Sequence, residues 1–295
     1  MLLIALEYLI LASTFTIAKK VLSYSPYLFL LTARFLVGGI FLVASMHVMK
    51  KISWRVVWRD RWLFVLAGFL HIYIAFLFEF WALQYLTSAK TALMYAITPF
   101  VAAILSRTLY KEKLSALKWA GIGIGTMSLL PVLSLQVAGF SEFLYFSLPE
   151  AVLCTAVVSA CAAWFVVKAL MARGHHLVTV NGIAMLIGAG FFLPTLLLIE
   201  PCAWYQVSSW PAFMGWLALL IFLSQVVSYN LYSWLLTRYS ITFMTLCGFL
   251  CPLFSAGLGA AWLGEAIPWQ YWASLGGVVG GLVLFTARVG AQNNN

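Results

Sequence analysis

Charged residues are scarce in this chain. Only eight of its 295 residues are Asp or Glu, and charged residues of both signs make up 8% of the sequence. Soluble globular domains carry about 25% charged residues, so a soluble domain of ordinary composition is excluded. Apolar residues take their place, at 64% of the chain, and the mean hydropathy is +1.00. We therefore expect an integral membrane protein.

Cysteine is also sparse, and its spacing gives no sign of a metal site. The five cysteines lack metal-ligand spacing, and all but Cys202 lie in apolar segments. His175 and His176 lie in a basic turn without partner ligands. We read the cysteines as packing residues and expect no metal and no cofactor.

Ten segments are apolar and long enough to cross a bilayer, which needs about 20 residues per helix. No soluble domain fits between them, so the expected fold is an all-α integral membrane protein with ten transmembrane helices. The first segment lacks a basic region before its apolar run, so we expect a retained helix and not a signal peptide. The ten predicted spans are 2–18, 27–47, 62–84, 90–109, 117–135, 145–168, 178–199, 212–236, 241–263 and 269–287.

Basic residues outnumber acidic ones, and their distribution indicates how the chain is oriented. Of 17 Lys and Arg residues, 13 fall on one side of the predicted spans, three fall on the other, and Arg34 lies within a helix. By the positive-inside rule, both termini are cytoplasmic. We expect a multi-pass protein of the cell (inner) membrane that contacts lipid, binds no nucleic acid and is a monomer.

The two halves of the sequence are similar to each other. An offset of 153 residues places Trp81 on Trp234 and Pro99 on Pro252, and ten of 43 positions match between 81–123 and 234–276. Roughly four matches are expected by chance in so biased a composition. We predict repeats at 1–140 and 141–290, followed by a disordered tail at 291–295. Because five helices is an odd number, the second repeat is inverted, as in many secondary transporters.

The motifs of the two halves resemble those of a known family. ITPFVAAILSRTLYKEKLSALKWAGIGIG in the first half corresponds to LCPLF and AAWLGEAIPWQYWASLGGVVGG in the second. This pattern of a Pro-bearing helix, a short turn with Glu and a Gly-rich helix resembles the drug/metabolite transporter superfamily, in particular its EamA-type ten-helix members. The resemblance implies a 5+5 inverted topology with cytoplasmic termini. The aromatic and acidic helices are also similar to those of carriers that exchange S-adenosylmethionine for S-adenosylhomocysteine.

The segment YIAFLFEFWAL at residues 73–83 contains a single carboxylate, Glu79. An intramembrane carboxylate is costly and usually faces protein or a wet cavity. Under the 153-residue offset Glu79 corresponds to Tyr232, and Gln225, Ser228 and Tyr229 share a helix face with Tyr232. We predict that Glu79 and this face bind the substrate. The alternatives are that the polar face joins two helices, and that Glu79 forms a buried salt bridge with Arg34 or Lys90.

Further residues complete the predicted site. Aromatic rings beside a carboxylate favour a desolvated cation, and they can also stack a purine ring. Glu7 is a second intramembrane carboxylate, although it could instead snorkel to the surface. Pro99 and Pro252 interrupt helices and are predicted hinges. Helices 1, 3, 4, 6, 8 and 9 surround the cavity in the family that this chain resembles, which implies four more wall residues: Phe15, Tyr95, Ser159 and Trp164.

The predicted function is a secondary carrier for a small polar metabolite, working by alternating access at a central cavity. The favoured substrate is S-adenosylmethionine or a similar cationic or zwitterionic amino-acid or nucleoside-like compound. One alternative is an exporter of amino acids or drugs. An intramembrane enzyme is disfavoured, because His71 and Glu79 are eight residues apart without an obvious further catalytic residue.

Overall fold

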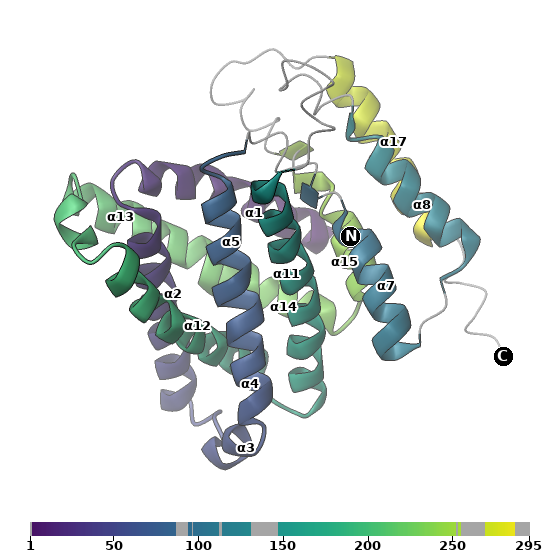
Figure 1. Ribbon diagram of the computed structural model, residues 1–295. Helices are drawn as coiled ribbons and strands as arrows, with labels where there is room; N and C mark the ends of the chain where they lie inside the picture. Colours follow the sequence, from purple (N-terminus) through teal and green to yellow (C-terminus); the bar gives the residue numbers. More distant parts are fainter. Residues whose placement is uncertain are drawn as a thin grey trace. The chain divides into compact units, whose positions relative to one another are not determined.

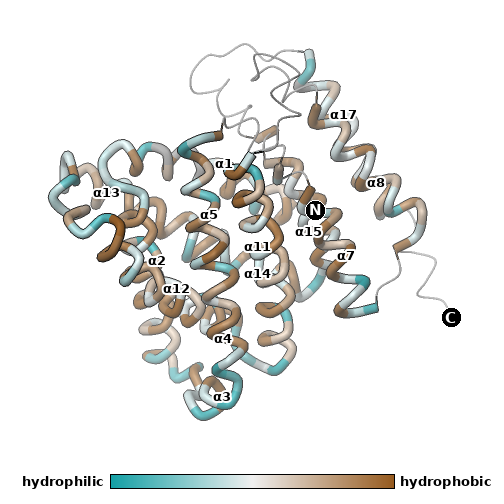
Figure 2. Tube along the Cα trace, viewed as in Figure 1, coloured by the Kyte–Doolittle hydropathy of each residue, from teal (hydrophilic) through white to brown (hydrophobic). Residues whose placement is uncertain are grey.

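The computed structural model describes residues 2–86, 94–95, 97–111, 114–130, 147–251, 253–254 and 269–286, except for the side chains of residues 15, 16, 19 and 271. These residues form helices and short connections, with no strand among them (Figure 1). Figure 2 shows that the helices are mostly hydrophobic along their length and that hydrophilic residues gather near the turns around α3. The predicted all-α class is confirmed for this described part of the chain.

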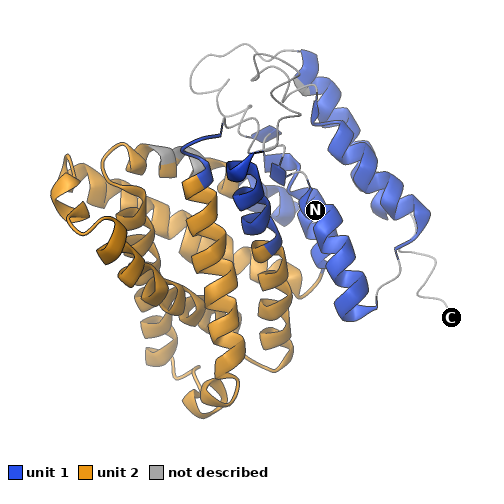
Figure 3. Cartoon of the chain, viewed as in Figure 1, with its two compact units in different colours: residues 1–9, 82–158, 239–295 blue, residues 10–81, 159–238 orange. Residues whose placement is uncertain are grey.

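The chain divides into two compact units (Figure 3). Unit 1 contains residues 1–9, 82–158 and 239–295, and unit 2 contains residues 10–81 and 159–238. Each unit combines a stretch from before residue 141 with a stretch from after it.

Unit 2 holds most of the long helices. Its elements are α1 (Leu2–Leu22, from residue 10), α2 (Tyr27–Val48), α3 (Trp54–Arg59), α4 (Arg61–Ala67), η1 (Gly68–Ile74), α5 (Ala75–Ala82, to residue 81), α11 (Leu148–Ala172, from residue 159), α12 (Leu177–Ile199), η2 (Ala203–Gln206), α13 (Trp210–Leu220), η3 (Ile221–Ser228) and α14 (Tyr229–Leu236). Unit 1 holds the start of α1, the start of α11, α7 (Thr98–Tyr110), α8 (Ala116–Met127), α15 (Ile241–Cys247) and α17 (Trp269–Thr286).

Each of the ten predicted spans contains a described helix or part of one. Five described helical stretches are long and apolar enough to cross a membrane: 27–48, 61–82, 148–172, 177–199 and 210–236. The 22 residues of α2 correspond to about 33 Å of helix, close to the roughly 30 Å of a bilayer core. The multi-pass membrane class follows from these lengths and this composition.

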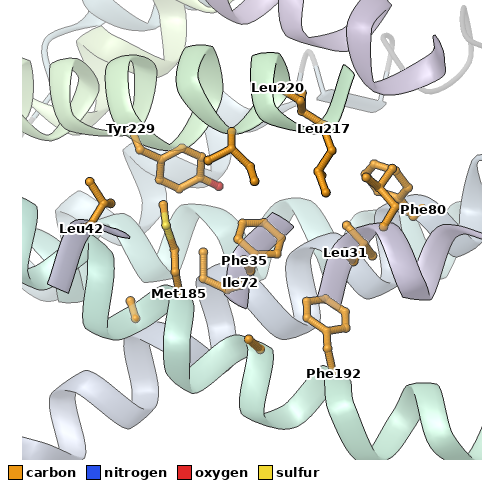
Figure 4. Close-up of a cluster of buried hydrophobic side chains, with 14 of the residues drawn as sticks. Leu31, Phe35, Leu42, Ile72, Phe80, Met185, Phe192, Leu217, Leu220 and Tyr229 are labelled. Carbon is orange, nitrogen blue, oxygen red and sulfur yellow. The ribbon is translucent and has the colours of Figure 1, made fainter. Parts of the chain in front are cut away.

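The core of unit 2 is built on α12, which packs against α2 and η1. Glycine permits this close approach: a Cβ added at Gly68 would lie 2.7 Å from Ile187, and one added at Gly188 would lie 2.3 Å from Ile72. The space between these helices is filled by their own side chains, among them Phe35, Ile72 and Phe192 (Figure 4). In a membrane such packing is driven by van der Waals contact, so close backbone approach contributes to stability.

A carboxylate that follows α12 lies near the start of α2. No side chain at Pro26 caps α2, but the Glu200 carboxylate, which follows α12, lies near the backbone N–H groups of Leu28 and Phe29. The first N–H groups of a helix lack intrahelical partners, and a carboxylate there also complements the helix dipole. The Glu200 carboxylate is therefore placed to complement the start of α2.

Unit 1 is held together by a glycine contact between α8 and α17. A Cβ at Gly121 would lie 2.7 Å from the Gly281 carbonyl oxygen, and a Cβ at Gly281 would lie 2.6 Å from the Gly121 carbonyl oxygen. In the same unit, the Tyr8 hydroxyl donates to the Met244 carbonyl. The small residues let two backbones touch, as they do in many membrane helix pairs.

Two helical stretches of unit 2 contain a π-helical segment. These segments are η1, at Gly68–Ile74, and η3, at Ile221–Ser228. The 153-residue offset between the sequence halves carries 68–74 onto 221–227, which lies within η3. Wide turns of this kind occur often at functional sites, so the residues around both segments are the natural place to look for one.

Candidate functional site

Four aromatic side chains of unit 2 lie together beside the π-helical segments. The Trp164 ring centroid is 4.2 Å from that of His71 and 4.3 Å from that of Tyr232. Tyr229 lies 5.2 Å from His71 and 6.0 Å from Trp164. We call His71, Trp164, Tyr229 and Tyr232 the ring cluster. Three of its members, Trp164, Tyr229 and Tyr232, are predicted substrate-binding residues, and the structure places both tyrosines against Trp164.

The ring cluster draws its residues from η1, α11 and α14. Figure 4 shows the Tyr229 side chain directed into the core that contains Phe35, Met185 and Ile72. Aromatic rings attract cations through their faces and also stack flat rings. The cluster is therefore suited to a cationic or aromatic group.

Side chains satisfy backbone carbonyls in both π-helical segments. The Ser159 hydroxyl donates to the Leu70 carbonyl in η1 at 2.8 Å. The Asn230 amide donates to the carbonyls of Val226 at 2.8 Å and Gln225 at 3.2 Å in η3. Buried carbonyls need such partners, so these residues hold the wide turns open. Ser159, predicted as a wall residue, makes its hydrogen bond to the backbone.

His71 is buried, with 4% of its surface exposed. Within the part of the chain that the structure describes, neither of its ring nitrogens has a hydrogen-bond partner. A neutral imidazole carries one donor and one acceptor, and a buried polar group without a partner is costly. His71 thus brings unused hydrogen-bonding capacity to the ring cluster.

A buried cation lies near this cluster. Arg34 on α2 is 4% exposed, and its Nη2 donates to the Ser224 hydroxyl at 3.0 Å. With the Gln225 amide oriented to satisfy both of its ends, Gln225 Oε1 accepts from Arg34 Nε at 2.7 Å, and Gln225 Nε2 donates to the Leu220 carbonyl at 3.2 Å. Gln225, predicted to bind substrate, therefore positions Arg34 in this structure.

Glu79 on α5 belongs to the same region. It is 8% exposed, and it lies within electrostatic range of Arg34 and of Tyr229. Unit 2 therefore places a carboxylate, a guanidinium and four aromatic rings on α2, η1, α5, α11 and α14.

The other predicted site residues lie elsewhere. Glu7 and Tyr95 belong to unit 1, and Tyr95 is half-buried, with its carbonyl accepting from the Thr98 hydroxyl at 2.6 Å. Glu7 is only 1% exposed, so the alternative that it snorkels to the surface is wrong: it is buried against protein. The Phe15 side chain lies outside the described residues.

The structure describes only one of the two predicted hinges. Pro99 lies in the first turn of α7, where its missing N–H costs no intrahelical bond. Ile97 forms a turn just before it. Pro252 lies outside the described residues. A hinge role at either position stays a prediction.

A second charged cluster lies where α4 begins and where α11 connects to α12. Asp60 accepts from Arg173 Nη1 at 2.6 Å and lies 2.8 Å from His175 Nε2. These hydrogen bonds, first from His175 and then from Arg173, lower the pKa of Asp60 to about 2. The sequence gives no sign of this pairing, because His175 and Asp60 lie 115 residues apart. His176 instead accepts from the Val178 N–H at the start of α12.

Three residues in or near the ring cluster were not predicted from the sequence as part of the site: Arg34, His71 and Ser224. Arg34 was considered only as a salt-bridge partner, although a lone arginine in an apolar span is itself a signal. The 153-residue offset pairs His71 with Ser224, and this pairing of polar positions could have identified both. Among the residues that the structure describes, no three His, Cys, Asp or Glu side chains are grouped to hold a metal.

Comparison with known proteins gives a family match over most of the chain. The model of the EamA-like transporter family matches residues 1–134 and 148–287. The structure is also similar to a solved crystal structure, with a TM-score of 0.73 over 97% of this chain and 96% of the other, at 20% sequence identity. The second likeness shows that the fold is shared with a known structure.

Curated relatives come from Chlamydia. The chain is 28% identical over 270 residues to a protein of Chlamydia muridarum named S-adenosylmethionine/S-adenosylhomocysteine transporter, covering 90% of this chain and 85% of the relative. It is also 28% identical over 272 residues to the protein of that name from Chlamydia trachomatis serovar L2, covering 90% of this chain and 82% of the relative.

Proposed function

Because the chain belongs to the EamA-like transporter family, we propose that it is a secondary carrier that moves a small polar metabolite across a cell (inner) membrane by alternating access. Its family and its curated relatives are transporters, so the chain is not assigned as an enzyme. The favoured substrate is S-adenosylmethionine or a similar cationic or zwitterionic compound. Export of amino acids or drugs is the alternative.

The architecture that we propose is ten membrane helices in a 5+5 inverted repeat. Three observations support it. The family model matches two stretches of similar length, 1–134 and 148–287. The π-helical segments η1 and η3 are related by the same 153-residue offset as the sequence halves. Each compact unit combines residues from before and from after position 141. Two similar halves can exchange conformations and open one site alternately to either side.

The orientation that we propose has both termini in the cytoplasm. The exposed Trp58 and Trp62, with Arg61 over both rings, lie at the end of unit 2 where α3 joins α4. The exposed Trp204 and Tyr205 lie on η2, which follows the opposite end of α12. Aromatic residues mark both interfaces of a membrane, and basic residues mark the cytoplasmic one.

The ring cluster is the observation that carries the proposed substrate class. Trp164 is within 4.3 Å of both His71 and Tyr232, measured between ring centroids. Glu79 lies in the same unit and within electrostatic range of Tyr229. Rings that can stack a purine, together with a carboxylate that attracts a sulfonium or ammonium group, match the two parts of S-adenosylmethionine. Aromatic amino acids present the same two kinds of group.

Ligand binding to the purified chain tests the proposal. A ligand at 100 times its dissociation constant stabilises a protein by about 2.7 kcal/mol, which a thermal-shift assay detects. We expect S-adenosylmethionine and S-adenosylhomocysteine to raise the melting temperature, and phenylalanine and tryptophan to raise it less. Exchange of the two adenosyl compounds across proteoliposomes checks transport. Stabilisation by the aromatic amino acids alone would favour the alternative.

A further inference from the structure

The clearest unexplained feature is the environment of Arg34. Its guanidinium is fixed by two hydrogen bonds, from Nη2 to the Ser224 hydroxyl and from Nε to Gln225 Oε1. It also lies 4.8 Å from the Phe35 ring centroid and 5.2 Å from the Phe76 ring centroid. These contacts come from α2, α5 and η3, so three elements hold the group in one orientation.

These contacts position the positive charge without neutralising it. Among the residues that the structure describes, no carboxylate oxygen lies within 4.0 Å of the guanidinium. Glu79 acts on Arg34 only through its electrostatic field. An arginine has five N–H donors, and the two hydrogen bonds leave the others available.

A buried cation with no adjacent anion is costly. Its charge has lost most of its hydration, and cation–π contacts recover only part of that loss. A carboxylate would both neutralise the charge and accept paired hydrogen bonds from the planar guanidinium. The site is therefore suited to an anionic group that arrives with a ligand.

We propose that Arg34 binds the carboxylate of the transported substrate and so makes the carrier selective for zwitterions of the amino-acid type. This inference rests on the proposed function, because it assigns one part of the same substrate. The carboxylate is held at Arg34, the positive group is attracted by Glu79, and the aromatic base lies against the ring cluster. Arg34 is then a specificity-determining residue, whereas a purely structural Arg34 would only join α2 to η3.

Two ligands that differ in one group separate these roles. Decarboxylated S-adenosylmethionine keeps the sulfonium, the amine and the adenine but lacks the carboxylate. Charge-assisted hydrogen bonds contribute about 1.5–3 kcal/mol, so we expect the purified full chain to bind this analogue roughly 10- to 100-fold more weakly than S-adenosylmethionine. Calorimetric titration of both ligands measures the ratio without any mutation.

Variants then test whether Arg34 causes the difference in affinity between the two ligands. In Arg34→Gln, the two ligands should bind with equal affinity, close to that of the wild type for the decarboxylated analogue. Lys20→Gln is the matched control, because it also removes one positive charge, from an exposed position of α1, and it should keep the wild-type ratio. If Arg34→Gln fails to fold, Arg34→Lys retains the charge without the planar pair of donors and should keep only part of the ratio.

Each outcome decides something. Equal binding of the two ligands by the wild type would overturn the role of Arg34 and leave the proposed function standing. An undiminished ratio in Arg34→Gln would do the same. Failure of the wild type to bind either ligand would refute the proposed substrate, and the inference about Arg34 with it.

Discussion

At the residue scale, Tyr232 is the member of the ring cluster whose removal tests stacking most directly. Its ring lies 4.3 Å from Trp164 between centroids. Tyr232→Ala should weaken S-adenosylmethionine binding by roughly 1–3 kcal/mol, in the range of base–aromatic stacking, and the protein should still fold. Titration calorimetry measures the loss.

The matched control is Tyr205→Ala, which removes a tyrosine that is 73% exposed on η2. It should leave the affinity unchanged. If Tyr232→Ala binds as tightly as the wild type, the polar face of η3 and α14 serves only to join helices, as the alternative from the sequence holds.

Glu79 gives the second prediction at this scale. Glu79→Gln keeps size and hydrogen bonding but removes the negative charge, so binding of a cationic or zwitterionic substrate should fall about tenfold or more. Glu79→Asp retains the charge and should retain part of the affinity. If the charge of Glu79 serves binding, the melting temperature should change little.

The opposite pattern would point to architecture. Breaking a buried ion pair costs about 3–5 kcal/mol. A Glu79→Gln protein that melts early, and that recovers both stability and transport when Arg34 is also neutralised, would contradict the binding role of Glu79.

At the element scale, Asp60 joins the start of α4 to the connection between α11 and α12. Its pKa is lowered from 3.8 to about 2 by the hydrogen bonds from His175 and Arg173. A carboxyl group whose pKa is lowered by folding adds stability above its unfolded pKa, and that stability disappears as the pH falls through the folded pKa. The contribution is thus complete above about pH 4 and is lost towards about pH 2.

Asp60→Asn should therefore lower the melting temperature at neutral pH, and its difference from the wild type should shrink as the pH falls below about 4. Thermal unfolding over this pH range measures the difference. Arg59→Gln is the control: this side chain is 67% exposed, and its Nη2 lies 3.6 Å from Asp60 Oδ2, so it should change little. A difference that is independent of pH would contradict the assigned role of the carboxylate.

Helical periodicity predicted the tyrosine face of the site but not the relation between His71 and Glu79. Tyr229 and Tyr232 lie three residues apart, and this local spacing correctly predicts one shared helix face, which meets Trp164. His71 and Glu79, eight residues apart, would point about 80° away from each other on a regular α-helix. The wide turns of η1 lie between them and change that angle, and nothing in the apolar sequence predicted a π-helical segment there. Pairs such as Asp60 and His175 depend on tertiary packing and lie beyond any local pattern.

At the scale of the whole molecule, membrane orientation gives the last prediction. In unit 2, α2 ends near α3, and α12 runs from that end of the unit to η2. The end at α3 and the end at η2 are therefore about 33 Å apart along the helices. With the exposed Cys202 replaced by Ser, Lys50→Cys and Asn293→Cys should react with membrane-impermeant thiol reagents only from the cytoplasm. Tyr205→Cys should react only from outside. Labelling of positions 50 and 293 from opposite faces would contradict an even number of spans.

Composition and length were sufficient to predict the membrane class and the all-α character of the described residues. Each predicted span contains part of a described helix, because a bilayer requires long apolar helices with their backbone groups satisfied internally. The packing units were less accessible to sequence reasoning. Each unit combines distant stretches, and contacts such as Gly68 with Ile187 depend on how helices cross. The repeat boundary at 140/141 lies outside the described residues.

The π-helical segments also bear on how relatives of this chain should be aligned. A π-helical turn usually reflects one extra residue in an α-helix, and insertions are otherwise tolerated mainly in surface loops. Relatives that lack the extra residue should therefore align with a single-residue gap in the middle of a membrane helix, near 68–74 or near 221–228. An alignment that moves such a gap into the nearest loop would shift every residue between the two places by one position, and Glu79 or Tyr232 would then be matched to the wrong neighbour.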